Sequence, residues 1–484
     1  MKSASTVSAS ENEEVLELYG GLKSFFIPFG VLVVGIAAFA LQGAAQLPVY
    51  WVIALAAIFV GLLLAKNKSV YIDSLIEGIS STMLGVMLLA WFLAGIMGKL
   101  LSAGGLIDGL AWAATQLGVG SAWFPLIAFV LSGLLSVSTG TAMGTVLVAT
   151  PTLFFAGFAV GADPFLLLGA IIGGAIFGGN VAPVSDTTII SAYSQGASIQ
   201  KVVKTRLPYA WVAVAITVVI YIGFAVLHDS GGVVSQVDGE ANPASLVMLL
   251  VPALTITLML LGRHFVEALL YSNVLGIILG WATGLLQPAD IFFVDTAASE
   301  SGGFIIEGID GSVGVVVVAI FLMALIGTLR RGGVVEWLIA ATERYATNPR
   351  RSELVLVFVV LIINALVVVT PVAMVMASPF VRRVGHSAGL APWRRANLFD
   401  ACSNVFGGGL PYAMALLVPY SMVMEQVHDA GYTAFSPVTL ACFAFYCWVL
   451  LLVMLFAVVT GWRREFSTEE ELEAEAKEME ESVV

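Results

Sequence analysis

The sequence predicts an all-α polytopic membrane protein made of two inverted-topology repeats, each with five spans (one of them broken) and a re-entrant hairpin. Three observations support this fold class: the composition, an internal repeat and the distribution of positive charge. Apolar residues make up 59% of the 484 residues, charged residues only 11%, and the mean hydropathy is +0.98. A soluble protein needs roughly a quarter of its residues charged to cover its surface. The composition therefore excludes a soluble enzyme, a secreted disulfide scaffold and a nucleic-acid-binding protein.

Apolar stretches long enough to cross a bilayer core of ~30 Å recur along the chain. In the first half we expect three spans, a hairpin, a broken span and a last span, at 24–42, 48–65, 80–101, 122–159, 164–190 and 208–227. In the second half we expect the same series at 244–262, 264–286, 312–329, 353–381, 396–424 and 437–460. The segments 104–120 and 332–345 are typical of amphipathic helices that lie at the membrane surface.

The two halves resemble each other in sequence. Glu77 aligns with Glu307 and Gly98 with Gly327, and "FGGNVAP" from Phe177 aligns with "FGGGLP" further on. This ordered series indicates an internal duplication. Five crossings per half is an odd number, so the second half must be inverted. We expect a cytoplasmic polar tail (1–22), a first repeat (23–228), an external loop (229–243), a second repeat (244–464) and an acidic cytoplasmic tail (465–484).

The positive charges fix the expected orientation, because Lys- and Arg-rich loops stay in the cytoplasm. On this assignment 20 of the 21 Lys and Arg residues are cytoplasmic, and Lys99 is the exception. Loops 228–243, 287–303 and 425–436 carry acidic residues but no Lys or Arg, and they mark the outside. We therefore expect a multi-pass protein of the cytoplasmic membrane with both termini in the cytoplasm.

The net charge of −12 lies mostly in the tails. Without the two tails, 20 acidic and 19 basic residues remain. Such terminal blocks of like charge are usually solvated and disordered, and we expect this of both tails. The net charge is therefore no argument for a cationic substrate.

Polar side chains at membrane depth are candidates for function because burying them in lipid is costly. The first cluster lies in "GGNVAPVSDTTIISA" and contains Asn180, Ser185, Asp186, Thr187 and Thr188. Glycines and a proline beside so many side-chain oxygens favour an unwound stretch that faces a cavity. A carboxylate among hydroxyl and carbonyl oxygens is a hard-ligand site suited to Na⁺ or H⁺. The alternative is that Asp186 caps a helix.

The second cluster occupies the matching place in the other half and contains Asp400, Ser403 and Asn404. Asp400 is the second candidate for ion binding and, with the first acid, for proton coupling. The alternative is that Asp400 pairs with Arg394 or Arg395 near the membrane face.

The hairpin tip "STGTAMGT" adds Thr139 and Thr141 as candidate ligands, although Ser and Thr often bond back to their own helix. The histidines fall in or near loops and form no ligand cluster. The sequence contains no Walker A, G-x-S-x-G or H-E-x-x-H motif. We therefore expect no ATP-driven or hydrolytic machinery, no enzyme activity and no cofactor.

The segment "GGAIFGGNVAPVSDTTIISAYSQGASIQKVVKTRLPYAWV" resembles the NhaC-type sodium/proton antiporter family of the ion-transporter superfamily. The S-D-T-T element and the K-T-R-L-P-Y-A that follows it carry this resemblance, and family members are similar to V-K-T-Q-L-P-Y-A at the second motif. "NLFDACSNVFGGGLPY" is similar to the family's second-half aspartate and Pro-aromatic pair. The resemblance points to Ser185, Asp186, Thr187, Thr188 and Asp400, and it implies an elevator-like moving unit and a homodimer.

The sequence departs from this family where relatives commonly have G-D-x-x-S-P. Gly179 stands in place of the acid, and Ala182 in place of the serine. From the resemblance we expect exchange of Na⁺ or Li⁺ for H⁺, with Asp186 as the Na⁺ ligand. The less acidic site keeps an alternative open, namely a Na⁺- or H⁺-coupled exchanger of a small organic anion or amino acid, such as malate or lactate.

Overall fold

The structure is a computed structural model that describes residues 14–42, 46–106, 109, 112, 120–227, 243–296, 300–367 and 369–481. Eleven helices of this part of the chain are long and apolar enough to cross a membrane, or twelve when one bent pair is counted. The sheet found there has two short antiparallel strands, β1 (Phe293–Asp295) and β2 (Glu300–Gly302). The prediction of an all-α polytopic membrane protein is confirmed.

The helices of the first half follow the predicted series. They are α1 (Phe26–Leu41), α2 (Leu47–Leu64), α3 (Lys68–Ile79), α4 (Thr82–Ala103), α6 (Phe124–Thr139), α7 (Ala142–Ala149), α8 (Phe155–Ala159), α9 (Pro164–Val181), α10 (Asp186–Ser194) and α11 (Ile199–Leu227).

The second half contains the corresponding elements. They are α12 (Leu250–Leu260), α13 (Phe265–Ala282), α14 (Pro288–Ile291), α15 (Phe304–Arg331), α16 (Val334–Glu343), α17 (Pro349–Val367), α18 (Thr370–Ser387), α19 (Pro392–Gly409), α20 (Met414–Asp429), α21 (Pro437–Phe443), α22 (Phe445–Thr460) and α23 (Glu469–Glu481). The inversion of one half against the other, and the repeat boundaries, stay predictions.

All ten predicted spans coincide with an apolar helix or helix pair of sufficient length. The two further apolar helices, Ser121–Thr139 and Ala142–Ala159, are the arms of the first predicted hairpin. The broken spans fall where the sequence places them, between α9 and α10 and between α19 and α20. Two features were not predicted. A separate helix, α3 (Lys68–Ile79), precedes the third span and ends just before Ser81, which caps α4, and the last span bends by 56° between α21 and α22.

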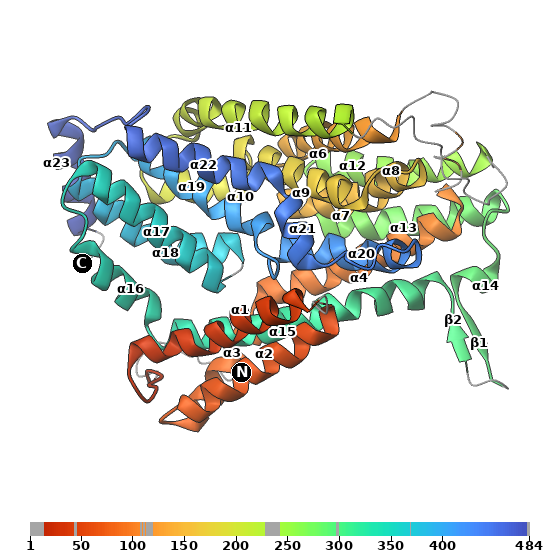
Figure 1. The fold of residues 1–484 in the computed structure, drawn as a ribbon, viewed down its shortest axis with the longest axis horizontal. Helices are drawn as coiled ribbons and strands as arrows, with labels where there is room; N and C mark the ends of the chain where they lie inside the picture. Colours follow the sequence, from red (N-terminus) through yellow and green to blue (C-terminus); the bar gives the residue numbers. More distant parts are fainter. Residues whose placement is uncertain are drawn as a thin grey trace, which may run out of the picture.

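The helices form two groups that lie side by side (Figure 1). In the first group α1, α2, α3 and α15 run along the lower edge of the view, and α15 also packs on α4, which in turn contacts α13. The second group contains both hairpins, both broken spans and α11 and α22. The groups contact each other mainly where α4 meets α7 and α20, where α15 meets α20, and where α12 meets α6 and α7.

Glycines allow the backbones of the first group to approach closely, as is common between membrane helices. A Cβ atom at Gly78 of α3 would lie 2.1 Å from the carbonyl oxygen of Met323. A Cβ atom at Gly327 of α15 would lie 2.0 Å from the carbonyl oxygen of Ser74. The crossing of α3 and α15 therefore depends on the absence of both side chains.

The prediction that the acidic C-terminal tail is disordered is wrong for its described part, although Glu469, Glu470, Glu471 and Glu473 are exposed to solvent as expected. Residues 469–481 form α23, and Glu475, only 10% exposed, pairs with Arg395 at 2.8 Å and with Arg382 at 3.1 Å. The backbone before α23 also bonds to the α18–α19 connection, through Ala391 N to Glu465 O at 3.0 Å. Arg395, which is buried, and Arg382, which is 20% exposed, compensate the charge of Glu475 and hold the described part of the tail against the α18–α19 connection.

The described part of the N-terminal tail is also packed on the protein, and not solvated as predicted. Leu16 and Leu18 are buried, and Glu17 pairs with Lys66 at 2.8 Å. Residues 1–13, the predicted external loop apart from residue 243, and most of the predicted surface helix 104–120 lie outside the described residues. The second predicted surface helix corresponds to α16, which packs on α15, α17 and α18.

Candidate functional site

A cavity of about 440 Å³ lies between the two helical groups. Its walls come from α4 and the start of α13 on one side, and from both hairpin tips and both broken spans on the other. The lining residues are Thr82, Val86, Met87, Thr141, Ala142, Met143, Ile176, Asp186, Thr187, His264, Phe265, Val369, Thr370, Pro371, Asn404, Gly407, Met414 and Ala415. Most of the predicted polar clusters therefore meet at one place.

Asp186 is the first residue of α10 and is exposed to this cavity. One carboxylate oxygen accepts a hydrogen bond from the backbone N–H of Thr187 at 2.8 Å, and the Ser185 hydroxyl lies 3.5 Å from the same oxygen. The Ser185 and Thr187 hydroxyls are 3.2 Å apart. The N-cap position of α10 is Ser185, so Asp186 is the first helical residue and not the cap; its carboxylate accepts a backbone hydrogen bond in the first turn and still faces the cavity.

Asp400 has a different environment. It lies within α19, is 0% exposed, and forms an ion pair with Arg206 of α11, itself only 1% exposed. The Thr188 and Ser191 hydroxyls each donate to the same carboxylate oxygen at 3.3 Å. Asp400 is therefore fully partnered and shielded from the cavity.

Arg206 is held by several acceptors besides Asp400. Its Nη1 donates to the carbonyl oxygen of Asn180 at 2.6 Å, and its Nε donates to Asn397 at 3.0 Å. Because Asn180 lies near the end of α9, the guanidinium ties the first broken span to the second. A charge-assisted network of this kind fixes geometry as well as charge.

Asn404 connects the two aspartate environments. Its amide nitrogen donates to Asp400 at 2.5 Å and lies 3.4 Å from the Thr187 hydroxyl. Asn404 also lines the cavity. A continuous series of polar contacts therefore runs from Asp186 through Thr187 and Asn404 to Asp400.

The hairpin tips bring further hydroxyls to the cavity. Thr141 caps α7 by accepting from Gly144 N at 3.2 Å, and Thr370 begins α18. A Cβ atom at Gly140 in the first tip would lie 2.7 Å from a methyl carbon of Val184, so this tip sits against the break between α9 and α10. The tips therefore close the cavity around both broken spans.

Besides Asp400, five predicted ligands do not line the cavity, and three of them bond elsewhere. The Thr139 hydroxyl donates to Leu135 O at 3.0 Å within its own helix. Ser403 accepts from Asn364 at 3.1 Å, and Asn180 donates to Tyr446 at 3.3 Å; both are buried. Ser185 and Thr188 stand directly behind the lining, next to the two acids.

The alternative in which Asp400 pairs with Arg394 or Arg395 is wrong. Arg394 pairs with buried Glu353 at 2.7 Å, and Arg395 pairs with Glu475 of α23. Both side chains extend from the start of α19 away from Asp400, which lies more than one turn further along the helix. The sequence cannot show this, because these partners come from α17 and α23.

Sequence reasoning missed two residues of the site. From its sequence position, Arg206 was assigned only to a cytoplasmic loop. The signal that could have found it is its place in the K-T-R-L-P-Y-A motif, where the family resemblance leads us to expect Gln. His264 begins α13, lines the cavity and accepts from Val266 N at 3.2 Å through Nδ1. Nothing in the spacing of His264 indicated that its helix turn faces both broken spans.

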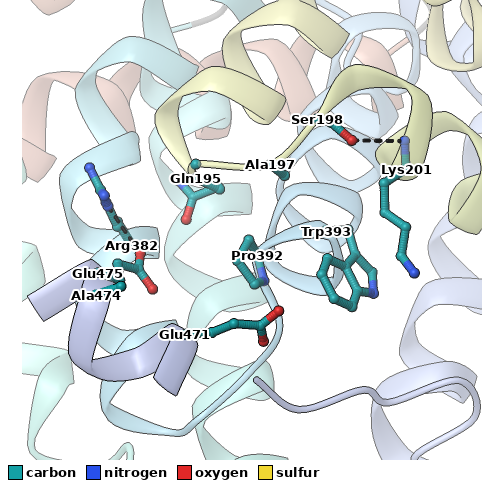
Figure 2. Close-up of a pocket in the computed structure, with 11 residues that line it drawn as sticks. Gln195, Ala197, Ser198, Lys201, Arg382, Pro392, Trp393, Glu471, Ala474 and Glu475 are labelled. Atoms are coloured by element: carbon teal, nitrogen blue, oxygen red, sulfur yellow. Dashed lines mark hydrogen bonds and ion pairs between the residues drawn. The ribbon is translucent and has the colours of Figure 1, made fainter. Parts of the chain in front are cut away.

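A second cavity, of about 600 Å³, lies where α23 docks (Figure 2). Gln195, Arg382 and Trp393 line it together with Glu471 and Glu475 of α23. Lys201 lies with its ammonium 4.3 Å from the centre of the Trp393 ring. This cavity contains none of the predicted site residues, so the smaller cavity is the candidate transport site.

Comparisons with known proteins agree with the geometry. A model of the Na⁺/H⁺ antiporter family matches residues 2–226 and 240–462. The malate-2H⁺/Na⁺-lactate antiporter of Bacillus subtilis (strain 168) is 26% identical over 335 residues, covering 64% of this chain and 69% of the relative.

Two further relatives are transporters. The Na⁺/H⁺ antiporter NhaC of Alkalihalophilus pseudofirmus is 23% identical over 296 residues, covering 57% of this chain and 62% of the relative. The arginine/ornithine antiporter ArcD of Halobacterium salinarum is 23% identical over 365 residues, covering 70% and 72%. These relatives differ in what they exchange, so similarity alone does not select a substrate.

Proposed function

The chain belongs to the Na⁺/H⁺ antiporter family, and from this premise we propose that it exchanges Na⁺ or Li⁺ for H⁺ across the cytoplasmic membrane by alternating access. Membership of this family indicates a multi-pass membrane transporter and not an enzyme. The identity of the exchanged ions is the proposal.

One observation carries the proposal: Asp186 exposes a carboxylate to a cavity between two helical groups. A carboxylate with Ser, Thr and Asn oxygens around it binds a hard cation or a proton, but not both at once. Competition of Na⁺ and H⁺ for this carboxylate produces antiport when the protein changes the side to which the site opens only with one of the two ions bound. The position of the cavity between the two groups supports alternating access, because motion of one group would change the side to which the cavity opens.

Asp400 has a positioning role in this mechanism. The charge of Asp400 is neutralised by Arg206. Asn404 contacts both Asp400 and Thr187, so Asp400 helps to fix the position of Thr187 beside the ion site. The site then has one carboxylate available for exchange, which supports a ratio of one Na⁺ to one H⁺. The glycine at position 179, where the family resemblance leads us to expect an acid, supports the same ratio.

Proteoliposomes with an imposed pH gradient test the proposal. Addition of Na⁺ alone should dissipate the gradient for the wild-type chain, and Asp186→Asn should abolish the response. Asp163→Asn is the control, because the Asp163 carboxylate also accepts a backbone hydrogen bond at the start of a helix, from Leu166 N at 3.0 Å, but lies outside the cavity. Wild-type exchange by Asp186→Asn, or no response of the wild type to Na⁺ or Li⁺, would refute the proposal.

The size of the cavity favours a second candidate, the coupled exchange of a small organic anion or amino acid. A volume of about 440 Å³ is far larger than a bare ion and falls in the usual range for organic ligands. The malate/lactate and arginine/ornithine relatives support this candidate. It requires that Na⁺ moves protons only when malate, lactate or an amino acid is present in the same assay.

A further inference from the structure

Building on the proposed function, we infer that the cavity accepts organic monocations: a primary ammonium group with a small apolar body, bound at Asp186 in place of the metal cation. This assignment goes beyond ion exchange because it names a substrate class that inorganic cations do not represent. It also separates this class from organic anions of the same size.

The charge of the lining is the first argument. Asp186 is the one carboxylate among the 18 lining residues, and none of them is Lys or Arg. His264 accepts a backbone hydrogen bond from Val266 N at Nδ1, at 3.2 Å. Arg206 of the polar network is paired with Asp400, and Arg263, which directly precedes His264, is paired with Glu267 at 3.5 Å. An organic anion would therefore face Asp186 without a compensating cation.

The polar groups next to Asp186 suit an ammonium. A primary ammonium has three N–H donors and no acceptor. Thr141, Thr187 and Thr370 supply hydroxyl oxygens to the same cavity, and Asn404 supplies an amide oxygen. The amide nitrogen of Asn404 already donates to Asp400, so the amide oxygen is the atom left to accept. One carboxylate with several neutral acceptors is the complement of a single ammonium group.

The rest of the lining is apolar. Met87, Met143 and Met414 come from three different helices, and Phe265 and Ile176 add an aromatic and a branched surface. A hydrated metal ion leaves such walls in contact with water, whereas an apolar body removes that surface from water. Methionine side chains also adapt to bodies of different shape. The walls therefore favour a cation that carries carbon.

Three probes of matched shape test the inference on the purified full-length protein in detergent. The probes are 2-phenylethylammonium, 3-phenylpropionate and 3-phenyl-1-propanol, measured by isothermal titration calorimetry at one pH and salt concentration. We expect 2-phenylethylammonium to bind at least about tenfold more tightly than the other two, a difference that one ion pair in a partly desolvated site supplies. Na⁺ should compete with it.

Two variants assign the binding to the cavity. Asp186→Asn should abolish the preference for the ammonium probe, and Asp163→Asn should preserve it. Met143→Ser should weaken 2-phenylethylammonium several-fold but leave methylammonium, which has no large apolar body, unchanged relative to wild type. Equal binding of all three probes, or a preference that survives in Asp186→Asn, would overturn the inference.

Na⁺-driven exchange in proteoliposomes, measured on the same preparation, separates this inference from the proposed function. Na⁺/H⁺ exchange without a preference for the ammonium probe overturns the inference and leaves the exchange intact. A preference for the ammonium probe that depends on Asp186, in a protein that shows no Na⁺/H⁺ exchange, supports the assigned substrate class and overturns the proposed metal-ion exchange.

Discussion

Replacing Arg206 by glutamine, the residue that the family resemblance leads us to expect there, tests the charge balance of the site most directly. The change removes the guanidinium from Asp400 in a place where both side chains are at most 1% exposed. Breaking one partner of a buried ion pair costs about 3–5 kcal/mol, because the other charge stays buried without compensation. Arg206→Gln and Asp400→Asn should each lower the free energy of unfolding by about this amount.

The double variant separates the ion pair from other effects. Arg206→Gln/Asp400→Asn leaves no buried charge, so its cost should be smaller than the sum of the two single costs by at least about 2 kcal/mol. Arg206→Lys is a control that keeps the charge but loses the planar fork reaching Asn397 and the carbonyl oxygen of Asn180, and it should be intermediate.

Reversible unfolding in mixed dodecyl maltoside and SDS micelles, followed by circular dichroism, measures these free energies. Additive costs, with a coupling energy below about 0.5 kcal/mol, would show that Arg206 and Asp400 do not depend on each other. That result would refute the reasoning that Asp400 is neutralised within the fold.

Three further predictions concern packing and the tail. Gly327→Ala should lower the free energy of unfolding by about 1–3 kcal/mol, the usual cost of overpacking, because the added Cβ would meet a carbonyl oxygen of α3. Gly311→Ala on the same helix is the control: its Cβ would meet nothing within 4 Å, so this variant should be neutral or stabilising in the same unfolding assay. Glu475→Gln should release α23, seen as faster proteolysis after residue 464, and unchanged cleavage would contradict the role of the pair with Arg395. Glu353→Gln should destabilise by about 3–5 kcal/mol in thermal or SDS unfolding, since the carboxylate is 0% exposed and paired with two arginines; a loss below about 1 kcal/mol would contradict this.

The spans and their breaks could be predicted from the sequence because a bilayer imposes local constraints. A helix must remain apolar over a fixed length, and unwound backbone requires glycine, proline and side-chain oxygens nearby. These constraints act between neighbours in the chain, so the breaks after Val181 and after Gly409 were visible in the sequence. The choice of Asp186 as an exposed acid followed from the same local reasoning.

The partners of buried charge could not be predicted in this way. Asp400 is separated from Arg206 along the chain and meets it only because α11 packs on α19. Arg394 and Arg395 stand beside each other in the sequence, but they pair with residues of two different elements. The ordered tail was missed for the same reason, because a run of glutamates in the sequence does not show which arginines they pair with in the fold.

The sequence by itself determined that this protein is a helical membrane transporter with two unwound, acid-containing spans, because hydropathy and helix-breaking residues act locally. Only the tertiary structure decided how the two acids differ. Asp186 faces a cavity between two helical groups, whereas Asp400 is enclosed with Arg206. The physical reason is that the cost of a buried charge depends on which distant side chain the fold places next to it.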